Sequence, residues 1–391
     1  MACSPVSKRR GEAVKAGQVA GRQDNRMGIG NLKKRLQLRA WSRYLRLASR
    51  EHKLRYLFWE ATLSCNLACR HCGSDCSSGK DTRFELTTEE IVGGFESIAA
   101  RYDPKGIMVG ITGGEPLLRK DLFTVTERIS ALGFPWGMVT NGFAMTKEAI
   151  EKCRATGMHT ITVSIDGLKD DHNWLRRNEG SFDRALGALR ALRDKPFLSS
   201  LEVATSVSRR VIDKLPDIYA FIEKEGIRDW RLITLFPGGR ARNDEDLLLR
   251  PEDYRKLYAF VRDVRKADPP VRVTVDEEGY LGCEFEREVR DAFYSCRAGI
   301  EIGGILAHGE ISACPSVSRR LVQGNIRKES FPDCWESKFQ PFRDRRWMRQ
   351  GACENCAQWW ICKGNSLHLW NFDRNEPDVC HFNCLHAKER V

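Results

Sequence analysis

The chain has 391 residues, of which 41% are hydrophobic, enough for one large domain with a smaller one beside it. No apolar run approaches the roughly 18 residues that a membrane span needs, and the first residues lack the apolar segment of a secretory signal. The formal net charge of +11 suggests nucleic-acid binding, but residues 1–55 alone hold 15 Lys and Arg against 3 Asp and Glu. Because the rest of the chain is close to neutral, we do not expect nucleic acid to be its main partner. The lack of a secretory signal and of a long apolar run makes the cytoplasm the expected compartment, with no membrane span.

The basic N-terminal arm divides at Met27, which is itself a candidate start of the chain. Residues 1–26 are polar and basic with little to bury, which predicts a disordered tail. Residues 27–54 are expected to form a basic amphipathic helix, because apolar residues recur at helical intervals between Lys and Arg. The apolar stripe consists of Leu32, Leu36, Trp41, Leu45 and Leu47. We favour a helix that packs on the main domain and has a solvated basic face; contact with RNA, a membrane surface or an acidic partner is the alternative.

From residue 55 to about 270 the chain repeats a strand-then-helix rhythm. One expected helix begins at Thr87, which has capping-box spacing to Glu90, and others begin near Leu118 and Pro251. The alternation predicts an α/β fold, a partial (β/α)6 TIM-like barrel, with a doubly wound sheet as the competing architecture. In both, ligands lie at the carboxyl ends of the strands. The apolar runs that predict strands are 56–63, 106–112, 136–140, 160–165, 201–207 and 231–236.

Fifteen cysteines are unusual for a cytosolic chain, where clustered thiols more often mean a metal site or catalysis than disulfides. The first group, Cys65-x3-Cys69-x2-Cys72, lies in the loop after the first expected strand, and Cys76 follows it. Three thiolates on one short loop suit three irons of a 4Fe–4S cluster and leave the fourth iron open. A tetrahedral zinc site with Cys76 as the fourth ligand is the alternative.

This loop, together with "TGGEP" at 112–116 after the second expected strand, resembles the radical S-adenosylmethionine (SAM) superfamily. The resemblance implies a 4Fe–4S cluster on Cys65, Cys69 and Cys72 that binds SAM and cleaves it reductively to a 5′-deoxyadenosyl radical. It also implies contacts between the SAM amino group and the motif's Gly113, Gly114 and Glu115. Glycines suit this task on physical grounds too, because a backbone without Cβ comes close to a ligand.

Further SAM contacts follow from the same resemblance. His71 stands where the family usually has an aromatic residue beside adenine. After the fourth expected strand, "VSIDG" places Ser164 and Asp166, and Arg176 follows twelve residues after the serine. Ser164 and Arg176 are implied to bind the SAM carboxylate and Asp166 to lie beside the sugar, with Arg177 as the alternative if the register shifts by one. Asn141, after the third strand, is a weaker pocket candidate, and "LFPGGRAR" at 235–242 is expected to add backbone contacts near adenine.

Residues 271–391 resemble a SPASM domain, a small Cys-rich region that carries auxiliary iron–sulfur clusters, and follow a core expected at 55–270. One auxiliary cluster is implied for Cys353, Cys356, Cys362 and Cys380. The family has a further cysteine where this chain has Ser366, so the ligand set of Cys296 and Cys314 stays open. The alternatives are a second cluster completed by Cys384 or another group, one cluster shared by Cys296, Cys314, Cys353 and Cys356, or a zinc knuckle.

Most relatives with this domain modify peptides or proteins, so we expect a peptide or protein substrate, such as a ribosomally made peptide or, from a narrower resemblance, a lipoprotein. The expected reductant is of the flavodoxin or ferredoxin type. A radical SAM enzyme acting on RNA or a small molecule and a non-enzymatic iron–sulfur or zinc protein are the other hypotheses. No acid or base is singled out by spacing, so the catalytic residues are unknown from the sequence.

Overall fold

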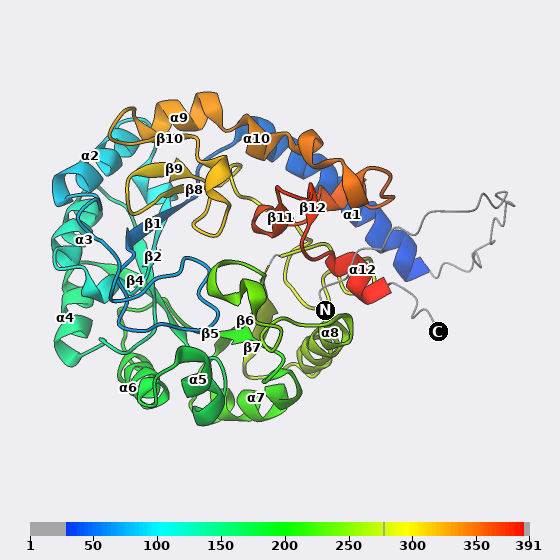
Figure 1. The fold of residues 1–391 in the computed structure, drawn as a ribbon, viewed down its shortest axis with the longest axis horizontal. Helices are drawn as coiled ribbons and strands as arrows, with labels where there is room; N and C mark the ends of the chain where they lie inside the picture. Colours follow the sequence, from blue (N-terminus) through cyan, green and yellow to red (C-terminus); the bar gives the residue numbers. More distant parts are fainter. Residues whose placement is uncertain (1–28, 277, 387–391) are drawn as a thin grey trace, which may run out of the picture.

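The computed structural model describes residues 29–276 and 278–386, so the expected tail at 1–26 and the division at Met27 lie outside the described residues. Its main feature is a ten-stranded sheet that curls around a central space, with helices on the outside (Figure 1). The strand order is β10-β9-β8-β1-β2-β3-β4-β5-β6-β7. Strands β8 and β1 to β7 run parallel, and β9 and β10 pair antiparallel to their neighbours.

The strands are β1 (Tyr56–Thr62), β2 (Met108–Gly113), β3 (Trp136–Thr140), β4 (Met158–Ser164), β5 (Ser200–Val207), β6 (Asp229–Thr234), β7 (Arg272–Val275), β8 (Ile302–Ile305), β9 (Glu310–Ser312) and β10 (Gly324–Asn325), with β11 (Trp370–Asn371) and β12 (Glu376–Pro377) in a separate pair. The helices are α1 (Ile29–Glu51), α2 (Thr88–Ala99), α3 (Leu122–Ala131), α4 (Lys147–Ala155), α5 (Lys169–Arg176), α6 (Ser181–Leu192), α7 (Leu215–Lys224), α8 (Pro251–Lys266), α9 (Phe331–Lys338), α10 (Gln340–Arg343), α11 (Trp359–Cys362) and α12 (His381–His386).

All six expected strands are present, and the partial-barrel prediction is confirmed rather than the doubly wound sheet. The sheet is nevertheless larger than six units, because β7 extends one side and β8 adds a parallel strand beside β1. Both additions are four residues long, and β8 contains Gly303 and Gly304, so neither has the apolar run on which the prediction depended. The sheet thus continues past the expected domain boundary at 270/271, and that division stays a prediction.

Alternation along β1 explains how the barrel wall forms. Leu57, Trp59 and Ala61 are fully buried, and the Trp59 ring contacts Phe95 of α2 edge-on at 6.5 Å between ring centroids. Phe58, one position out of phase, lines the central cavity instead. Because successive side chains point to opposite faces of a strand, one face packs on helices and the other is left for the site.

Helix starts follow the capping signals in the sequence. The Thr87 hydroxyl accepts from the Glu90 amide at the start of α2 while the Glu90 carboxylate accepts from the Thr87 amide at 2.8 Å, so the expected capping box is confirmed. Helix α8 begins at Pro251, where a missing N–H costs nothing.

Helix α1 corrects the expected orientation of the N-terminal helix. Its inward face consists of Leu38, Trp41, Ser42 and Ala48, whereas Leu32, Leu36 and Leu47 of the expected stripe are 53%, 57% and 56% exposed. The helix also packs on the C-terminal region rather than on the main domain. Leu38 clusters with Tyr280, Tyr294 and Ile361, and Trp41 Nε1 donates to the Tyr294 carbonyl at 3.1 Å.

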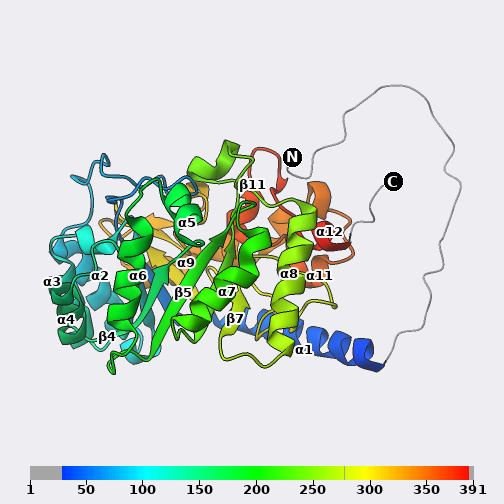
Figure 2. The same ribbon diagram turned by 90° about the horizontal axis from the view of Figure 1, so that it is seen from below.

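The C-terminal segments β11, β12 and α12 lie between the two edges of the open sheet (Figure 1). After Cys296, β8 and β9 form a hairpin with Gly309 at φ +89° in the turn. Turning the molecule shows α1 along its outer edge, away from the strand ends that carry the cysteine loop (Figure 2). Among the described residues, no helix is both long and apolar enough to cross a bilayer.

Candidate functional site

A cavity of about 1100 Å³ opens at the carboxyl ends of the strands, and Cys65, Cys69 and Cys72 all line it. The loop that carries them leaves β1, as the sequence predicts. Cys65 and Cys69 are 7% and 6% exposed and Cys72 is half-buried, and all three carry free thiols. The sequence-predicted thiols are therefore brought together at one end of the barrel.

Each of the three sulfurs faces a hydrogen-bond donor from the protein. Asn141 Nδ2 lies 3.8 Å from Cys65 Sγ, Arg176 Nη1 lies 3.7 Å from Cys69 Sγ, and the Cys76 amide lies 3.3 Å from Cys72 Sγ. Donors that point at sulfur stabilise the thiolate form, which is the form that binds iron, and such hydrogen bonds also set cluster potential. The donor set therefore fits an iron–sulfur cluster.

Cys76 differs from the other three cysteines of the loop. It is only 2% exposed, its amide donates to Cys72 Sγ at 3.3 Å, and its thiol donates to the Ser74 carbonyl at 3.9 Å. The proximity of Cys72 and Cys76 lowers the pKa of Cys72 and raises that of Cys76. Among the described residues, no three Cys, His, Asp or Glu side chains gather closely enough to be ligands of a single metal ion. That holds for Cys65, Cys69 and Cys72 as well, so what distinguishes Cys76 is its backbone amide, which donates to Cys72 Sγ.

Arg240 holds the cysteine loop in place. Its Nε donates to the Cys69 carbonyl at 2.7 Å, its Nη2 to the Cys76 carbonyl at 3.0 Å, and its Nη1 to the Asp75 carboxylate at 2.6 Å. The preceding Gly239 has φ +51° and approaches the loop so closely that a Cβ would lie 2.3 Å from the Cys72 carbonyl oxygen. The "LFPGGRAR" segment therefore clamps the loop, and its expected backbone contacts near adenine stay a prediction.

The glycines of "TGGEP" are required by the start of the cysteine loop. A Cβ on Gly113, which has φ +134°, would lie 2.3 Å from the Thr62 carbonyl oxygen, and one on Gly114 would lie 2.1 Å from that of Ser64. The Gly114 amide donates to the Thr62 carbonyl at 2.7 Å. Both glycines also line the cavity, so the motif joins β2 to the loop and presents its backbone to the same space.

Glu115 is fully buried and faces the protein. Its carboxylate accepts from the Thr140 hydroxyl at 2.9 Å, the Asn141 amide at 2.9 Å and the Leu117 amide at 3.3 Å. Burial raises the pKa of this carboxyl, and these donors oppose the shift. Glu115 therefore fixes the end of β3 and so orients Asn141 toward Cys65, and its contact with the SAM amino group stays a prediction.

The segment after β4 places Arg176 inside and Arg177 outside. Ser164 and Arg176 both line the cavity, whereas Arg177 is exposed at the left-handed C-cap of α5, so the geometry favours the unshifted register. Asp166 is 1% exposed, and its carboxylate accepts from Arg176 Nε at 2.6 Å and from the Ser206 amide at 2.9 Å. Although burial favours the neutral acid, Arg176 outweighs it and holds the pKa of Asp166 below its usual range.

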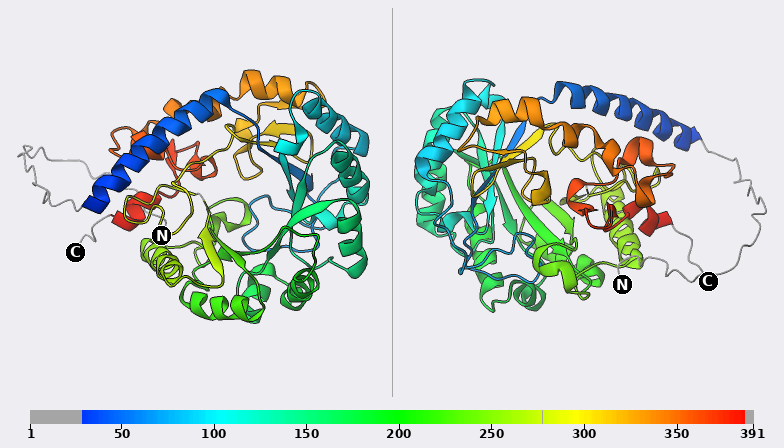
Figure 3. Two further views of the ribbon diagram at one scale, coloured as in Figure 1. Left: turned by 180° about the vertical axis from the view of Figure 1, so that it is seen from behind. Right: turned by 45° about the horizontal axis from the view of Figure 1, so that its top comes forward.

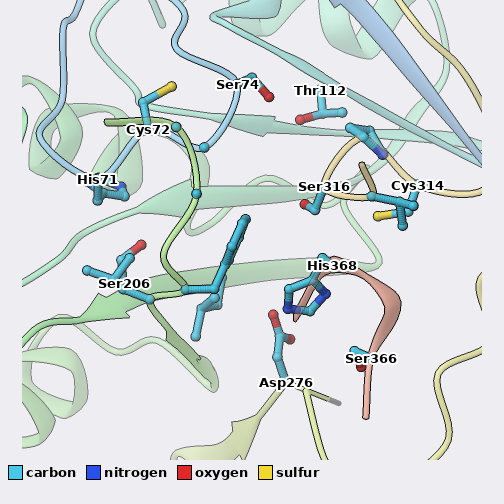
Figure 4. A pocket seen from close by; sticks show the side chains of 18 of the residues that line it. His71, Cys72, Ser74, Thr112, Ser206, Asp276, Cys314, Ser316, Ser366 and His368 are labelled. Carbon is cyan, nitrogen blue, oxygen red and sulfur yellow. The ribbon is translucent and has the colours of Figure 1, made fainter. Parts of the chain in front are cut away.

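His71 lies on the cavity wall near Cys72, opposite His368, Ser366 and Cys314 (Figure 4). Its Nδ1 is buried without a hydrogen-bond partner among the described residues. Burial lowers the pKa of His71 to about 4 despite the nearby Asp166, so the ring is neutral at pH 7. A half-buried neutral ring whose buried nitrogen lacks a partner among the described residues suits contact with a bound heterocycle.

The C-terminal cysteines divide into two sets. Cys296 and Cys314 line the same cavity as the N-terminal loop, as does Ser366, where the family has a cysteine. Burial would raise the pKa of Cys296, but the buried Arg345 outweighs it and lowers that pKa. Cys296 and Cys314, for which the sequence indicates no complete set of ligands, thus face the same space as the first cysteine loop.

The second set does not line that cavity. Burial, followed by the nearby Cys380 and Cys356, raises the pKa of Cys353 to about 12. Burial also raises the pKa of Cys362, with Cys353 as a smaller cause. The four expected cysteines therefore lie in the same region, although no three of the described ones are close enough to hold one metal ion, and their role as a ligand set stays a prediction. Of the cysteines outside both groups, Cys153 is fully buried in the core, and Cys283 is half-buried with its Sγ 3.7 Å from the Tyr280 hydroxyl.

Sequence reasoning missed the supporting role of residues that lie far from the cysteine loops in the sequence but contact them in the structure. Arg240, Gly239 and Arg345 hold loops through backbone carbonyls, and Arg345 Nη2 donates to the Cys296 carbonyl at 2.9 Å. A glycine pair followed by arginine after a predicted strand was the only signal for the first two.

Comparisons with known proteins agree with this arrangement. Residues 59–205 match the model of the radical SAM superfamily, and residues 296–357 match that of the SPASM iron–sulfur cluster-binding domain. The chain is 30% identical over 318 residues to the mycofactocin maturase MftC of Mycolicibacterium smegmatis, covering 80% of this chain and 77% of that protein. It is 28% identical over 328 residues to the AdoMet-dependent heme synthase of Methanosarcina barkeri, covering 79% of this chain and 90% of that protein.

A solved structure shares the fold. Streptococcus suis SuiB bound to the precursor peptide SuiA has a TM-score of 0.65 and 15% identity, covering 94% of this chain and 84% of that chain.

Proposed function

Because the chain belongs to the radical SAM superfamily and carries a C-terminal SPASM domain, we propose that it is an enzyme that modifies a peptide or protein held in the cavity between its two sets of cysteines. Its cofactors are SAM, the 4Fe–4S cluster that binds it and auxiliary iron–sulfur clusters. When bound, the 4Fe–4S cluster and SAM supply the 5′-deoxyadenosyl radical that takes a hydrogen atom from the substrate.

The residues of this chain divide the work of holding those cofactors. Cys65, Cys69 and Cys72 hold the 4Fe–4S cluster, and the donors from Asn141, Arg176 and the Cys76 amide stabilise their thiolates. The backbone at Gly113 and Gly114, with Ser164 and Arg176, forms the SAM site beside the cysteine loop, since all four line the cavity. Arg176 suits a carboxylate because its donors form a rigid planar fork.

The observation that supports a large substrate is the shared cavity. Cys72 on one side and Cys314 on the other face the same space (Figure 4). Its volume of about 1100 Å³ exceeds the roughly 300–1,000 Å³ of ordinary ligand pockets. This leaves room for SAM and a segment of a peptide together. SuiB, which shares the fold, is described bound to a precursor peptide, and the relative MftC is named a maturase.

The auxiliary ligands follow the two sets seen in the structure. We assign one cluster to Cys353, Cys356, Cys362 and Cys380, away from the cavity. Cys296 and Cys314 hold a second, incompletely ligated group on the cavity wall, because Ser366 replaces the cysteine that would complete it. The working reductant is of the flavodoxin or ferredoxin type, and the expected compartment is the cytoplasm.

A second substrate class has specific support. The match to a heme synthase spans 90% of that protein's length. In addition, three arginines from the C-terminal region line the cavity: Arg297, Arg319 and Arg320. Guanidinium groups bind carboxylates well, so a carboxylated macrocycle is the alternative occupant.

A substrate test separates the two classes. Anaerobically reconstituted enzyme, reduced with dithionite in the presence of SAM, is offered peptides encoded beside its gene or an iron porphyrin with carboxylate side chains. The proposal predicts that a peptide raises 5′-deoxyadenosine formation and changes mass in the same reaction. Turnover of the iron porphyrin with every peptide unchanged would replace the proposal by the second class.

A further inference from the structure

The outward face of α1 carries an apolar ridge that nothing in the described structure covers. Seven large apolar side chains are at least a third exposed among the described residues, and four of them, Leu32, Leu36, Tyr44 and Leu47, lie on this one helix. Leu32 and Leu36 are one turn apart and Leu36 and Leu47 are three turns apart, so these leucines follow one another along the same face.

Cations lie among and beside the leucines of that ridge. Lys33, Arg39, Arg43 and Arg50 are all exposed, and none of them forms an ion pair with another described residue. The only acidic residue of the helix is Glu51, at its end. The charged Lys34, by contrast, points inward and pairs with Glu288 at 2.7 Å. The outward surface therefore combines apolar side chains with unneutralised positive charge.

The inner face of the same helix is firmly held. Trp41 Nε1 donates to the Tyr294 carbonyl at 3.1 Å, and Ser49 Oγ donates to the Arg343 carbonyl at 3.1 Å. Figure 3 shows α1 along the outer edge of the molecule with one side clear of other elements. The helix thus presents a straight, fixed ridge rather than a segment that has to fold on binding.

We propose that this face of α1 docks the enzyme on the surface of an anionic lipid bilayer. A bilayer supplies both requirements at once, because apolar side chains enter the boundary of the acyl chains while Lys and Arg meet anionic headgroups. A nucleic acid would use the cations and leave the leucines in water. A second copy of the chain would bring the same cations against one another across a two-fold axis. The chain's own residues 1–28 are basic as well, so their charge does not complement this face.

The test measures co-sedimentation of the full chain with phosphatidylcholine vesicles that contain or lack phosphatidylglycerol. We expect binding that requires phosphatidylglycerol and weakens as salt is raised. The double variant Leu36→Ser/Leu47→Ser keeps every charge and is expected to bind about tenfold more weakly. The matched control is Phe84→Ser, which removes an apolar side chain that is 64% exposed elsewhere on the molecule and is expected to bind like the wild type.

Three outcomes would overturn the proposal. One is wild-type protein that fails to bind anionic vesicles at low salt, and another is equal binding by the wild type and the leucine double variant. The third is tight binding to a polyuridine oligonucleotide that the leucine variant retains while vesicle binding is absent, which would assign the face to RNA. Because SAM cleavage does not depend on these leucines, a failed proposal here leaves the proposed enzymatic function to its own test.

Discussion

Arg176 and Cys69 are in contact at the cavity wall: Arg176 Nη1 lies 3.7 Å from Cys69 Sγ, while Arg176 Nε donates to the Asp166 carboxylate at 2.6 Å. One buried guanidinium thus links the end of β4 to the cysteine loop after β1. Because the sulfur and the carboxylate both favour the charged form, they outweigh the cost of burial and raise the pKa of Arg176. The positive charge is therefore permanent at the wall where the SAM carboxylate is proposed to bind.

Replacing Arg176 is expected to impair SAM cleavage severely, whereas replacing the neighbouring Arg177 is expected to have little effect on it. Arg176→Gln removes a buried charge and leaves Asp166 unpaired, so we expect SAM cleavage to fall by at least about 100-fold. Arg177→Gln, at the exposed C-cap, serves as the control and is expected to stay within about twofold of the wild type. Equal losses in both variants, measured as 5′-deoxyadenosine by chromatography, would contradict the assignment of register.

Cys76 is expected to be dispensable for SAM cleavage, because the group that contacts Cys72 Sγ is its backbone amide, which an alanine keeps. Cys76→Ala should retain 5′-deoxyadenosine formation, whereas Cys69→Ala should abolish it. If cleavage is lost in both variants, the loop is an undivided four-thiol metal site. Iron content is measured alongside, so that failed reconstitution is not mistaken for lost chemistry.

Arg240 is expected to support cluster assembly. Arg240→Gln breaks charge-assisted hydrogen bonds to the Cys69 and Cys76 carbonyls, each worth about 1.5–3 kcal/mol when well formed. The loop should then take up less iron during reconstitution and show a broadened electron paramagnetic resonance signal. Arg242→Gln, two residues further along and exposed, is the matched control. Unchanged iron uptake and an unchanged signal in Arg240→Gln would refute this role.

The two C-terminal cysteine sets are expected to respond differently. Cys353→Ala should remove about four irons per chain, the content of one cubane cluster, and leave SAM cleavage in place. Cys296→Ala should remove fewer irons, because its site lacks the cysteine that Ser366 replaces. Identical iron losses in the two variants would favour one cluster shared by both sets.

One of the ion pairs between the barrel and the C-terminal region, Arg327–Glu90, gives stability a pH dependence. Arg327 donates to both Glu90 oxygens, at 2.6 and 3.0 Å, and this contact lowers the pKa of Glu90 to about 2. Because the folded pKa lies below the unfolded one, the stabilisation is present above about pH 4.5 and is lost as pH falls toward 2. Glu90→Gln keeps the capping box and removes only the charge pair.

For that variant we expect a loss of about 0.5–1 kcal/mol at pH 7, since the pair is partly exposed. The difference from the wild type should vanish near pH 2. Urea unfolding at several pH values measures both, and a constant difference across the range would assign the effect to the cap instead.

The sequence predicted the parts of this protein that depend on local pattern. Strand β3 and helix α8 match their expected bounds, and the Thr87 capping box forms as its spacing indicates. The three-plus-one division of the first cysteine loop also agrees with the contacts of Cys76. These features depend on residues close together in the chain.

The features that the sequence did not predict depend on contacts between distant segments. Arg240 meets the Cys69 carbonyl across 171 positions, and nothing in local periodicity indicates such a partner. Leu32, Leu36 and Leu47 of the predicted stripe of α1 face outward, whereas Trp41 of that stripe packs with Leu38 on the C-terminal region. A helix with apolar side chains on both faces has no unique inward side until its packing partner is known.

The central claim is that Cys65, Cys69 and Cys72 hold a cluster that cleaves SAM, and the most direct measurement is 5′-deoxyadenosine formed by the anaerobically reconstituted, reduced protein. We expect 5′-deoxyadenosine to form in proportion to the SAM consumed. Its formation should be abolished in Cys69→Ala and retained in Cys76→Ala. Protein with a full iron complement that forms none under reducing conditions would contradict it.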